Sequence, residues 1–317
     1  MRCILAALTL VLVGAATQAR AEPIVAVPIG GRMLVTFDST LPGAITSTVA
    51  VTGLGTASID VIDYRPSDGQ LYGYSRISNS IYRINTATGA ATLVSTLNNS
   101  SFSLDTIAMD FNPVTGQLRL VGFDAPRQIV RNLRVDVDTG ATVEEGNVRF
   151  APSDTNAGRL PFVTGAAYTN NFAGATATTL YVVSNGPLSL SVQDPPSSGV
   201  LTTVGPTIIP GVLIGFDISG LTGIAYATAN FPVEGVGTIP QFFTIDLSTG
   251  AATLVGRIGT GTGLPSQYVG VAAPVGRRAE PIPEPATVVL LLTGLAGVGA
   301  IGRRRKAAGE TKRQSEC

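Results

Sequence analysis

The sequence contains no histidine and no tryptophan, and only two cysteines among its 317 residues. Without histidine, a Ser-His-Asp triad, an H-E-x-x-H zinc site and a histidine general base are all excluded. Two cysteines cannot supply a four-thiolate zinc or iron–sulfur site. Charged residues make up only 13% of the chain, and 21 basic residues balance 21 acidic ones, so nucleic acid is not expected as a partner. Any chemistry must therefore rest on carboxylates, arginine, tyrosine and hydroxyl groups.

The N-terminus has the three parts of an export signal. Arg2 gives a positive start, residues 4–16 are an apolar run, and Ala19 and Ala21 form an A-x-A cleavage site. The alternative is a transmembrane anchor, but the apolar run is too short for a comfortable span. We expect cleavage after Ala21, which leaves Glu22 as the first mature residue.

The C-terminus has a second apolar segment, residues 286–302, which is long enough as a helix to reach about 25 Å. Pro283, Glu284 and Pro285 precede it, and Arg303, Arg304 and Arg305 follow it. Basic residues beside a span stay in the cytoplasm, so the N-terminus of this helix would lie outside.

This three-part order resembles the PEP-CTERM sorting tail of exported bacterial proteins. The resemblance implies an exosortase and the export machinery as partners, and transient anchoring in the inner membrane through the helix. It also implies cleavage near the Pro-Glu-Pro motif and release to the cell surface or an extracellular matrix. The run 307–317 departs from the pattern, because such tails usually stop soon after the basic cluster. A plain C-terminal anchor is the alternative.

Five segments follow from these signals: a signal peptide (1–21), a central domain (22–276), a linker with the Pro-Glu-Pro motif (277–285), a transmembrane sorting helix (286–302) and a basic cytoplasmic tail (303–317). The charge is unevenly divided among them. The central domain has eleven basic and seventeen acidic residues, a net charge of −6, and it contains neither lysine nor cysteine. Its stability must come from an ordinary hydrophobic core.

The central domain is built from repeats. One sequence motif is repeated at 80–94, 133–143 and 242–256, with less regular copies at 188–205 and 33–51. Alternating apolar residues predict a strand, Asp or Asn followed by Thr-Gly predicts a turn, and a Thr- and Val-rich strand returns.

A second repeated motif consists of a strand, a turn that contains Pro or Gly, and another strand. It occurs at 62–73, 109–119 and 216–226, and more loosely at 166–183. One copy of each motif together gives a repeat unit of four strands, and these units start near residues 59, 105, 163 and 213. A fifth unit is split: 269–272 supplies its first strand, and 24–27, 33–37 and 48–51 supply the others. The sequence therefore predicts an all-β fold, a five-bladed β-propeller closed by strands from both ends. A sandwich of hairpins and a six-bladed ring are the alternatives.

The segments 154–158 and 166–181, with the repeated hairpins, resemble an exported bacterial family known as a domain of unknown function, the DUF4394 type. The resemblance covers most of residues 30–260. It implies an exported protein, and it brings no established activity and no catalytic residues.

The candidate site residues are Asp63, Asp110 and Asp217, which occupy the same position on the first strand of three units. First strands line the channel of a propeller, so these carboxylates can converge. Their oxygen atoms suit Ca²⁺, the one cofactor we consider, and a carboxylate pair suits acid–base work on a polysaccharide. The alternative is structural: each Asp accepts hydrogen bonds from backbone N–H groups of its own or the next blade.

Other polar and aromatic residues are expected to be structural. Arg127, Arg131 and Arg134 form a small basic cluster at a hairpin, which we interpret as a solvated edge. Asp154 starts a polar inter-blade loop that lacks the ligand ladder of an EF-hand. The expected turn formers are Asp38, Asn85, Asp136 and Asp246, and the expected core aromatics are Tyr72, Tyr74 and Tyr82.

The sequence therefore predicts an exported, non-enzymatic propeller that acts as a binding or structural module at the cell surface, with exopolysaccharide as a further partner. The alternative is an extracellular glycan hydrolase or lyase that uses the channel carboxylates.

Overall fold

The computed structural model describes residues 21–98, 107–209, 212–259, 261 and 263–276. Within these ranges the chain is all β, apart from a turn of 3-10 helix at Pro196–Ser198. No helix in the described part of the chain is long and apolar enough to cross a membrane. The predicted sorting helix, the predicted basic tail and all but the last residue of the predicted signal peptide lie outside the described residues. The described residues all belong to one compact unit, Met1–Arg277.

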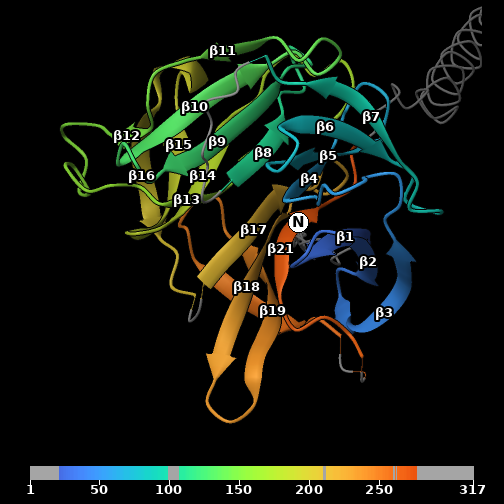
Figure 1. Ribbon diagram of the computed structural model, residues 1–317. Coiled ribbons are helices and arrows are strands. Elements are labelled where there is room, and N and C mark those ends of the chain that lie inside the picture. The colour runs from blue at the N-terminus through green and yellow to red at the C-terminus, as the bar shows by residue number, and fades with distance from the viewer. Residues whose placement is uncertain (1–20, 99–106, 210–211, 260, 262, 277–317) are drawn as a thin grey trace, which may run out of the picture. The chain divides into compact units, whose positions relative to one another are not determined.

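Five antiparallel sheets form the blades of a propeller (Figure 1). Three blades are continuous in sequence, and in each of them the first strand is the innermost and the fourth is the outermost. Blade 2 consists of β4 (Val61–Tyr64), β5 (Leu71–Ser75), β6 (Ser80–Ile84) and β7 (Ala91–Thr96). Blade 3 consists of β8 (Ile107–Phe111), β9 (Leu118–Asp124), β10 (Ile129–Val135) and β11 (Thr142–Glu144). Blade 5 consists of β17 (Val212–Ile218), β18 (Ala225–Val233), β19 (Gly237–Ile245) and β20 (Ala252–Arg257).

Blade 4 has a parallel addition at its outer edge. It consists of β13 (Val163–Tyr168), β14 (Leu180–Asn185), β15 (Leu188–Gln193) and β16 (Val200–Pro206), and β12 (Arg149–Phe150) pairs with β16 in parallel.

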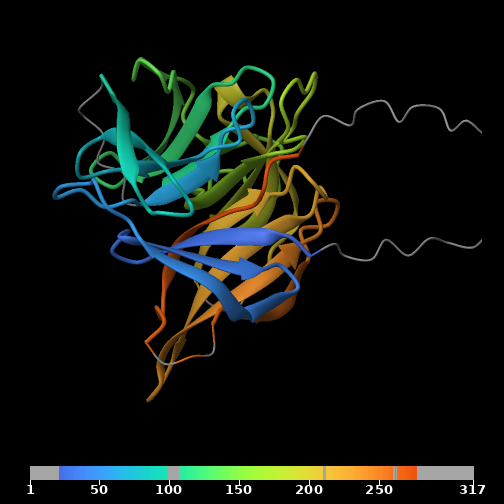
Figure 2. The same ribbon diagram turned by 90° about the vertical axis from the view of Figure 1, so that its right-hand side faces the viewer.

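Blade 1 joins the two ends of the domain. Its strands are β21 (Tyr268–Ala272), β1 (Pro23–Pro28), β2 (Met33–Asp38) and β3 (Leu41–Ala50). β21 pairs antiparallel with β1, with Ala26 opposite Val271. Both views show the N-terminal strands in blue beside the last strand in orange-red (Figures 1 and 2). This pairing closes the ring without a free inner edge.

The hydrophobic core lies between neighbouring blades. Each of the five blade-to-blade contacts has a cluster of buried apolar side chains in the described structure. Between blades 5 and 1, for example, the rings of Phe37 and Phe242 meet edge to face, with centroids 5.0 Å apart. Apolar contacts between neighbouring blades therefore hold the ring together, and residues 22–276 contain no cysteine that could form a disulfide.

The fold prediction is confirmed, and the sandwich and the six-bladed ring are wrong. The first strands of the four sequential units begin at residues 61, 107, 163 and 212, within two residues of the predicted starts. The split fifth unit has the predicted strand order. The outer strand of blade 1 is longer than predicted, because it begins at Leu41 rather than at residue 48.

Candidate functional site at the propeller axis

The innermost strands of the five blades surround the axis in the order β4, β8, β13, β17 and β21. Asp63, Asp110 and Asp217 stand next to last on β4, β8 and β17. The corresponding position is occupied by Ala167, next to last on β13, and by Ala272, the last residue of β21. Because equivalent positions of a propeller face the axis together, the repeat brings three carboxylates to one level.

The three carboxylates meet, as the sequence predicts. One oxygen atom from each of Asp63, Asp110 and Asp217 lies within 4.8 Å of the other two. The residues are 1%, 1% and 2% exposed, so the cluster is closed to solvent. We call these three residues the axial cluster.

Two members of the axial cluster accept hydrogen bonds from the backbone of their own and the next blade. Asp63 accepts from the N–H of Tyr64 (2.6 Å) and of Phe111 on β8 (2.8 Å). Asp217 accepts in the same way from the N–H of Ile218 and of Ala273, both at 2.6 Å. These bonds tie blade 2 to blade 3 and blade 5 to blade 1, the structural role considered from the sequence.

Asp110 differs from its two counterparts. The N–H of Tyr168 occupies the corresponding place on the next blade and acts to lower the pKa of Asp110. Neither carboxylate oxygen of Asp110, however, forms a hydrogen bond of ordinary geometry with any residue in the described ranges. A fully buried carboxylate without such bonds is costly unless it binds a proton or a cation.

Burial is the main electrostatic influence on the axial cluster. It raises the pKa of Asp63 and Asp110 well above the usual range, and the neighbouring carboxylates raise both pKa values further. It raises the pKa of Asp217 to about 7, although the backbone N–H groups of Ala273 and Ile218 oppose the shift. Without a cation, the cluster therefore binds protons more tightly than carboxyl groups exposed to water do.

A cavity of about 10 Å³ lies on the axis beside the cluster and is lined by all five innermost strands. Small residues, among them Ala108, Gly165, Gly215 and Gly270, bring these strands close together. The space suits about one water molecule. A glycan chain cannot reach the carboxylates through it.

The predicted turn and core residues are confirmed. The side-chain oxygen of Asn85, for example, accepts hydrogen bonds from the N–H groups of Ala87 and Thr88, and Asp38, Asp136 and Asp246 bind backbone N–H groups in the same manner. Tyr72, Tyr74 and Tyr82 are buried in the inter-blade cores.

The interpretation of Arg127, Arg131 and Arg134 as a solvated edge is wrong for Arg131, whereas the side chain of Arg127 is 57% exposed and that of Arg134 is 35% exposed. Arg131 is buried and pairs with Glu144 at 2.6 Å. Arg127 pairs with Asp124 at 2.7 Å, and Arg134 pairs with Glu145, also at 2.7 Å. The partners lie on β9 and β11 or just after them, and strand pairing brings them beside β10. Asp124 precedes Arg127 by only three residues, whereas Glu144 and Glu145 reach Arg131 and Arg134 through the pairing of β10 with β11.

Two features escaped the sequence analysis. Glu22 is buried, and its carboxylate accepts hydrogen bonds from Ser219, Thr222 and Tyr226. A pocket on blade 4 is lined by Asn156, Arg159 and the turn between β14 and β15. The polar segment 154–158 was a signal for the second feature, whereas the isolated Glu-Pro at the expected cleavage site gave no signal for the first.

Comparison with known proteins gives two sequence matches. The PEP-CTERM protein-sorting motif matches residues 281–306, which include Pro283, Glu284, Pro285 and the three arginines. This motif marks a chain that is exported, anchored transiently in the membrane and then placed at the cell surface or outside the cell. These residues lie outside the described structure. The curated proteins include no match to the chain.

Several solved structures are similar in fold. The nidogen/laminin complex gives a TM-score of 0.45 at 12% identity, covering 80% of this chain and 98% of that one. Regucalcin, a calcium-binding protein from Agrobacterium tumefaciens, gives 0.41 at 15% identity, covering 80% and 77%. A gluconolactonase from Xanthomonas campestris gives 0.39 at 15% identity, covering 79% of each chain.

The second sequence match covers most of the propeller. It extends over residues 33–271, from β2 of blade 1 through all the sequential blades to β21. The chain belongs to the family described as a domain of unknown function, DUF4394.

Proposed function

We propose that the domain is a non-catalytic module of the cell surface or extracellular matrix, and that its axial cluster holds a structural Ca²⁺ ion. The observation that carries the proposal is the closed position of Asp63, Asp110 and Asp217. Each is at most 2% exposed, and two of the three join neighbouring blades through backbone hydrogen bonds.

The geometry weighs against the alternative, a glycan hydrolase or lyase. Such an enzyme must place a sugar ring between two carboxyl groups, with a water on one side. In this domain the adjoining space is about 10 Å³, and the carboxyl groups are within 4.8 Å of one another. The axial cluster is therefore suited to holding the ring together rather than to turnover.

Three properties favour Ca²⁺ at the axial cluster. All donors are oxygen atoms, which Ca²⁺ prefers, at about 2.3–2.6 Å from the ion. Oxygen atoms within 4.8 Å of one another fit around one such ion. Neither oxygen atom of Asp110 forms a hydrogen bond of ordinary geometry with a described group, so this carboxylate is the most available ligand of the three.

The test uses residues 22–276, which contain every strand of the closed ring. The metal content of the purified protein and its melting temperature are measured in Ca²⁺ and in EDTA. We expect about one Ca²⁺ per chain and a higher melting temperature in Ca²⁺, because an ion bound only by the folded chain stabilises it.

Asp110→Asn should abolish the Ca²⁺ response, whereas Asp246→Asn, a change in an exposed turn, should retain it. A wild-type protein that contains no metal and melts identically in Ca²⁺ and EDTA would overturn the axial ion. Glycan cleavage that disappears in Asp110→Asn would overturn the non-catalytic assignment.

We also propose the segment boundaries predicted from the sequence, with 22–276 as the exported domain. Mass spectrometry of the surface-located or secreted protein should give Glu22 as the first residue and should lack the segment 303–317. Recovery of an intact basic tail at the cell surface would contradict processing by an exosortase.

A further inference from the structure

A pocket of about 510 Å³ lies on blade 4 and is separate in its lining from the axial cluster. Three segments form it: the loop before β13, the turn between β14 and β15, and the end of β16. The lining residues are Thr155, Asn156, Arg159, Asn185, Gly186, Pro187, Leu188, Ser189, Thr203 and Pro206. Its volume falls within the range of small-molecule sites.

The loop that carries Asn156 and Arg159 is fixed to the blade by Asp154. The Asp154 carboxylate accepts hydrogen bonds from the N–H and the hydroxyl of Thr203 at 2.6 and 2.8 Å, and from the N–H of Asn156 at 2.8 Å. The amide of Asn156 in turn donates to the hydroxyl of Thr203 at 3.0 Å. These bonds hold the pocket wall in place without a ligand, which lowers the entropy cost of binding.

Arg159 is the charged residue of this pocket. Its side chain donates to Asn156 Oδ1 at 3.3 Å, and within the described residues it forms no ion pair. By contrast, Arg119, Arg131 and Arg134 each contact a carboxylate. The pocket therefore presents an uncompensated cation in a domain whose net charge is negative.

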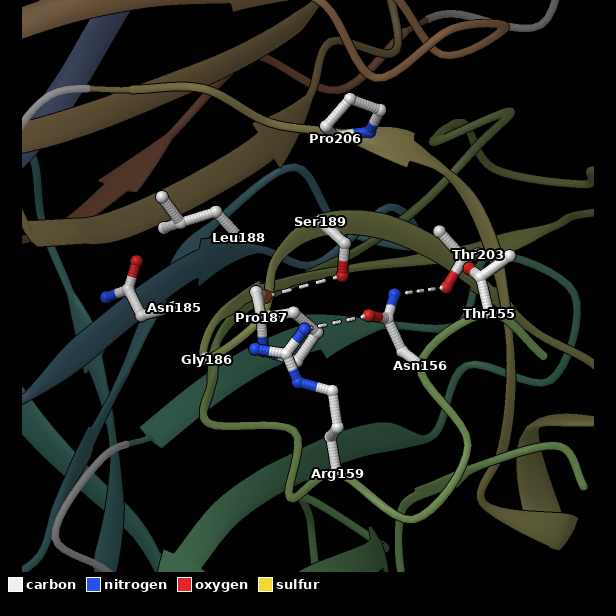
Figure 3. Close-up of a pocket in the computed structure, with 10 residues that line it drawn as sticks. All are labelled: Thr155, Asn156, Arg159, Asn185, Gly186, Pro187, Leu188, Ser189, Thr203 and Pro206. Atoms are coloured by element: carbon white, nitrogen blue, oxygen red, sulfur yellow. Dashed lines mark hydrogen bonds between the residues drawn. The ribbon is translucent and has the colours of Figure 1, made fainter.

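The remaining lining combines polar and apolar groups. Figure 3 shows the side chains of Arg159, Asn156 and Ser189 directed toward one another from two segments of the blade. The rings of Pro187 and Pro206 and the side chain of Leu188, which is 41% exposed, provide apolar surface. Amide and hydroxyl groups bind sugar hydroxyls, and apolar surface accommodates the C–H face of a sugar ring.

We propose that this pocket binds a carboxylate-bearing sugar unit of an acidic polysaccharide, with Arg159 as the partner of the carboxylate. A guanidinium matches the two oxygen atoms of a carboxylate. One cation balances one such group, whereas a phosphate dianion would need a second. The sugar unit would be the ligand of the binding module proposed above, so its assignment rests on that proposed function. The axial cluster takes no part in binding the sugar.

The experiment is a calorimetric titration of residues 22–276 with trigalacturonate, and with neutral maltotriose as the uncharged comparison. We expect binding of the acidic trisaccharide, at least tenfold weaker binding of the neutral one, and weakening with added salt. Arg159→Gln should lose at least tenfold in affinity. Arg257→Gln, which changes an exposed arginine outside the pocket, should leave affinity unchanged.

Equal affinity of wild type and Arg159→Gln, or no binding of trigalacturonate, would overturn the inference. Displacement by inorganic phosphate or sulfate at equal concentration would reduce the pocket to a general anion site and overturn the sugar assignment. Asp110→Asn should still bind the trisaccharide, so failure of the axial ion is distinguishable from failure of this pocket. Cleavage products in the titration cell would instead contradict the non-catalytic function and leave the binding site standing.

Discussion

The hydroxyl of Ser219 donates a hydrogen bond of 2.6 Å to Oε2 of Glu22, across 197 residues of sequence. Thr222 and Tyr226 donate to the other carboxylate oxygen at 2.8 and 2.6 Å. Glu22 is 2% exposed, and its own N–H donates to the hydroxyl of Ser39. The residue expected to begin the mature chain thus joins blade 1 to blade 5, beside the strand pair that closes the ring.

Replacing Glu22 with Ala should destabilise the domain by about 2–4 kcal/mol, because the buried hydroxyl groups of Ser219 and Tyr226 and the partly buried hydroxyl group of Thr222 lose their acceptor. Urea unfolding of residues 22–276 measures the change. Glu22→Gln should cost less, since the amide oxygen still accepts. Glu234→Ala, in an exposed turn of blade 5, is the matched control and should be nearly neutral. Equal effects at the two positions would contradict the closing role of Glu22.

The axial cluster predicts an unusual dependence of stability on pH. Burial raises the pKa of Asp217 from 3.8 to about 7, and those of Asp63 and Asp110 well above 3.8. Between about pH 4 and 7 the folded chain therefore keeps protons that the unfolded chain has released, so the free energy of unfolding falls as pH rises. In EDTA, we expect the domain to be more stable at pH 5.5 than at pH 7.5.

Carboxylates on the surface make the free energy of unfolding rise with pH, but they do so at lower pH than the axial cluster. Hydrogen bonds and ion pairs lower the pKa values of Asp38, Asp138 and Asp246, so their contribution is complete above their unfolded values, near 4. The interval from pH 5.5 to 7.5 therefore reports mainly on the axial cluster. Ca²⁺ should reverse the trend, since the ion competes with protons. A flat profile in EDTA, unchanged by Asp110→Asn, would contradict raised pKa values at the axis.

The repeat explains why the fold and the axial cluster could be predicted. Asp63, Asp110 and Asp217 follow the same apolar strand pattern, so the symmetry of a propeller places them together before any contact is known. The bonding of each carboxylate could not be predicted in this way. Asp63 and Asp217 accept backbone hydrogen bonds of ordinary geometry from described residues and Asp110 does not, although all three share the same strand pattern, so no local pattern encodes the difference.

Features that join segments distant in sequence were not predictable. The position of Glu22 depends on hydroxyl groups some 200 residues away, and the pocket on blade 4 depends on Asp154 reaching Thr203. The interpretation of Arg131 on β10 as part of a solvated edge is wrong for a similar reason, since its acidic partners lie on other strands. A linear reading finds the alternation and turn of each hairpin but not the neighbours that sheet pairing supplies.

The corrected arginine cluster leads to a prediction about Glu145. This carboxylate pairs with Arg119 at 2.9 Å and with Arg134 at 2.7 Å, and its side chain is 11% exposed. Glu145→Ala should cost about 3 kcal/mol, because it leaves the buried Arg119 without its counter-charge. Asp138→Ala removes the partner of Arg65 at a side chain that is 65% exposed, and should cost less than about 1 kcal/mol. Chemical unfolding of both variants measures the difference, and similar costs would contradict the network.

Two glycines on the innermost strands give a matched test of how closely the blades approach the axis. Gly165 on β13 and Gly270 on β21 both line the axial cavity, and neither has a positive φ. A Cβ on Gly165 would overlap Cβ of Phe216 on the next blade and lie 2.8 Å from Val183, whereas a Cβ on Gly270 meets its neighbours at 3.5 Å or more.

Gly165→Ala should therefore destabilise the domain by about 1–3 kcal/mol, because a crowded core must shift to accept the methyl group. Gly270→Ala adds a methyl group at ordinary contact distance and restricts the unfolded chain, so its effect should be near zero or slightly stabilising. Thermal unfolding of the two variants in the same Ca²⁺ concentration measures the contrast. A neutral Gly165→Ala would mean that blades 4 and 5 have room at the axis, and with it room for a ligand larger than an ion beside Asp217.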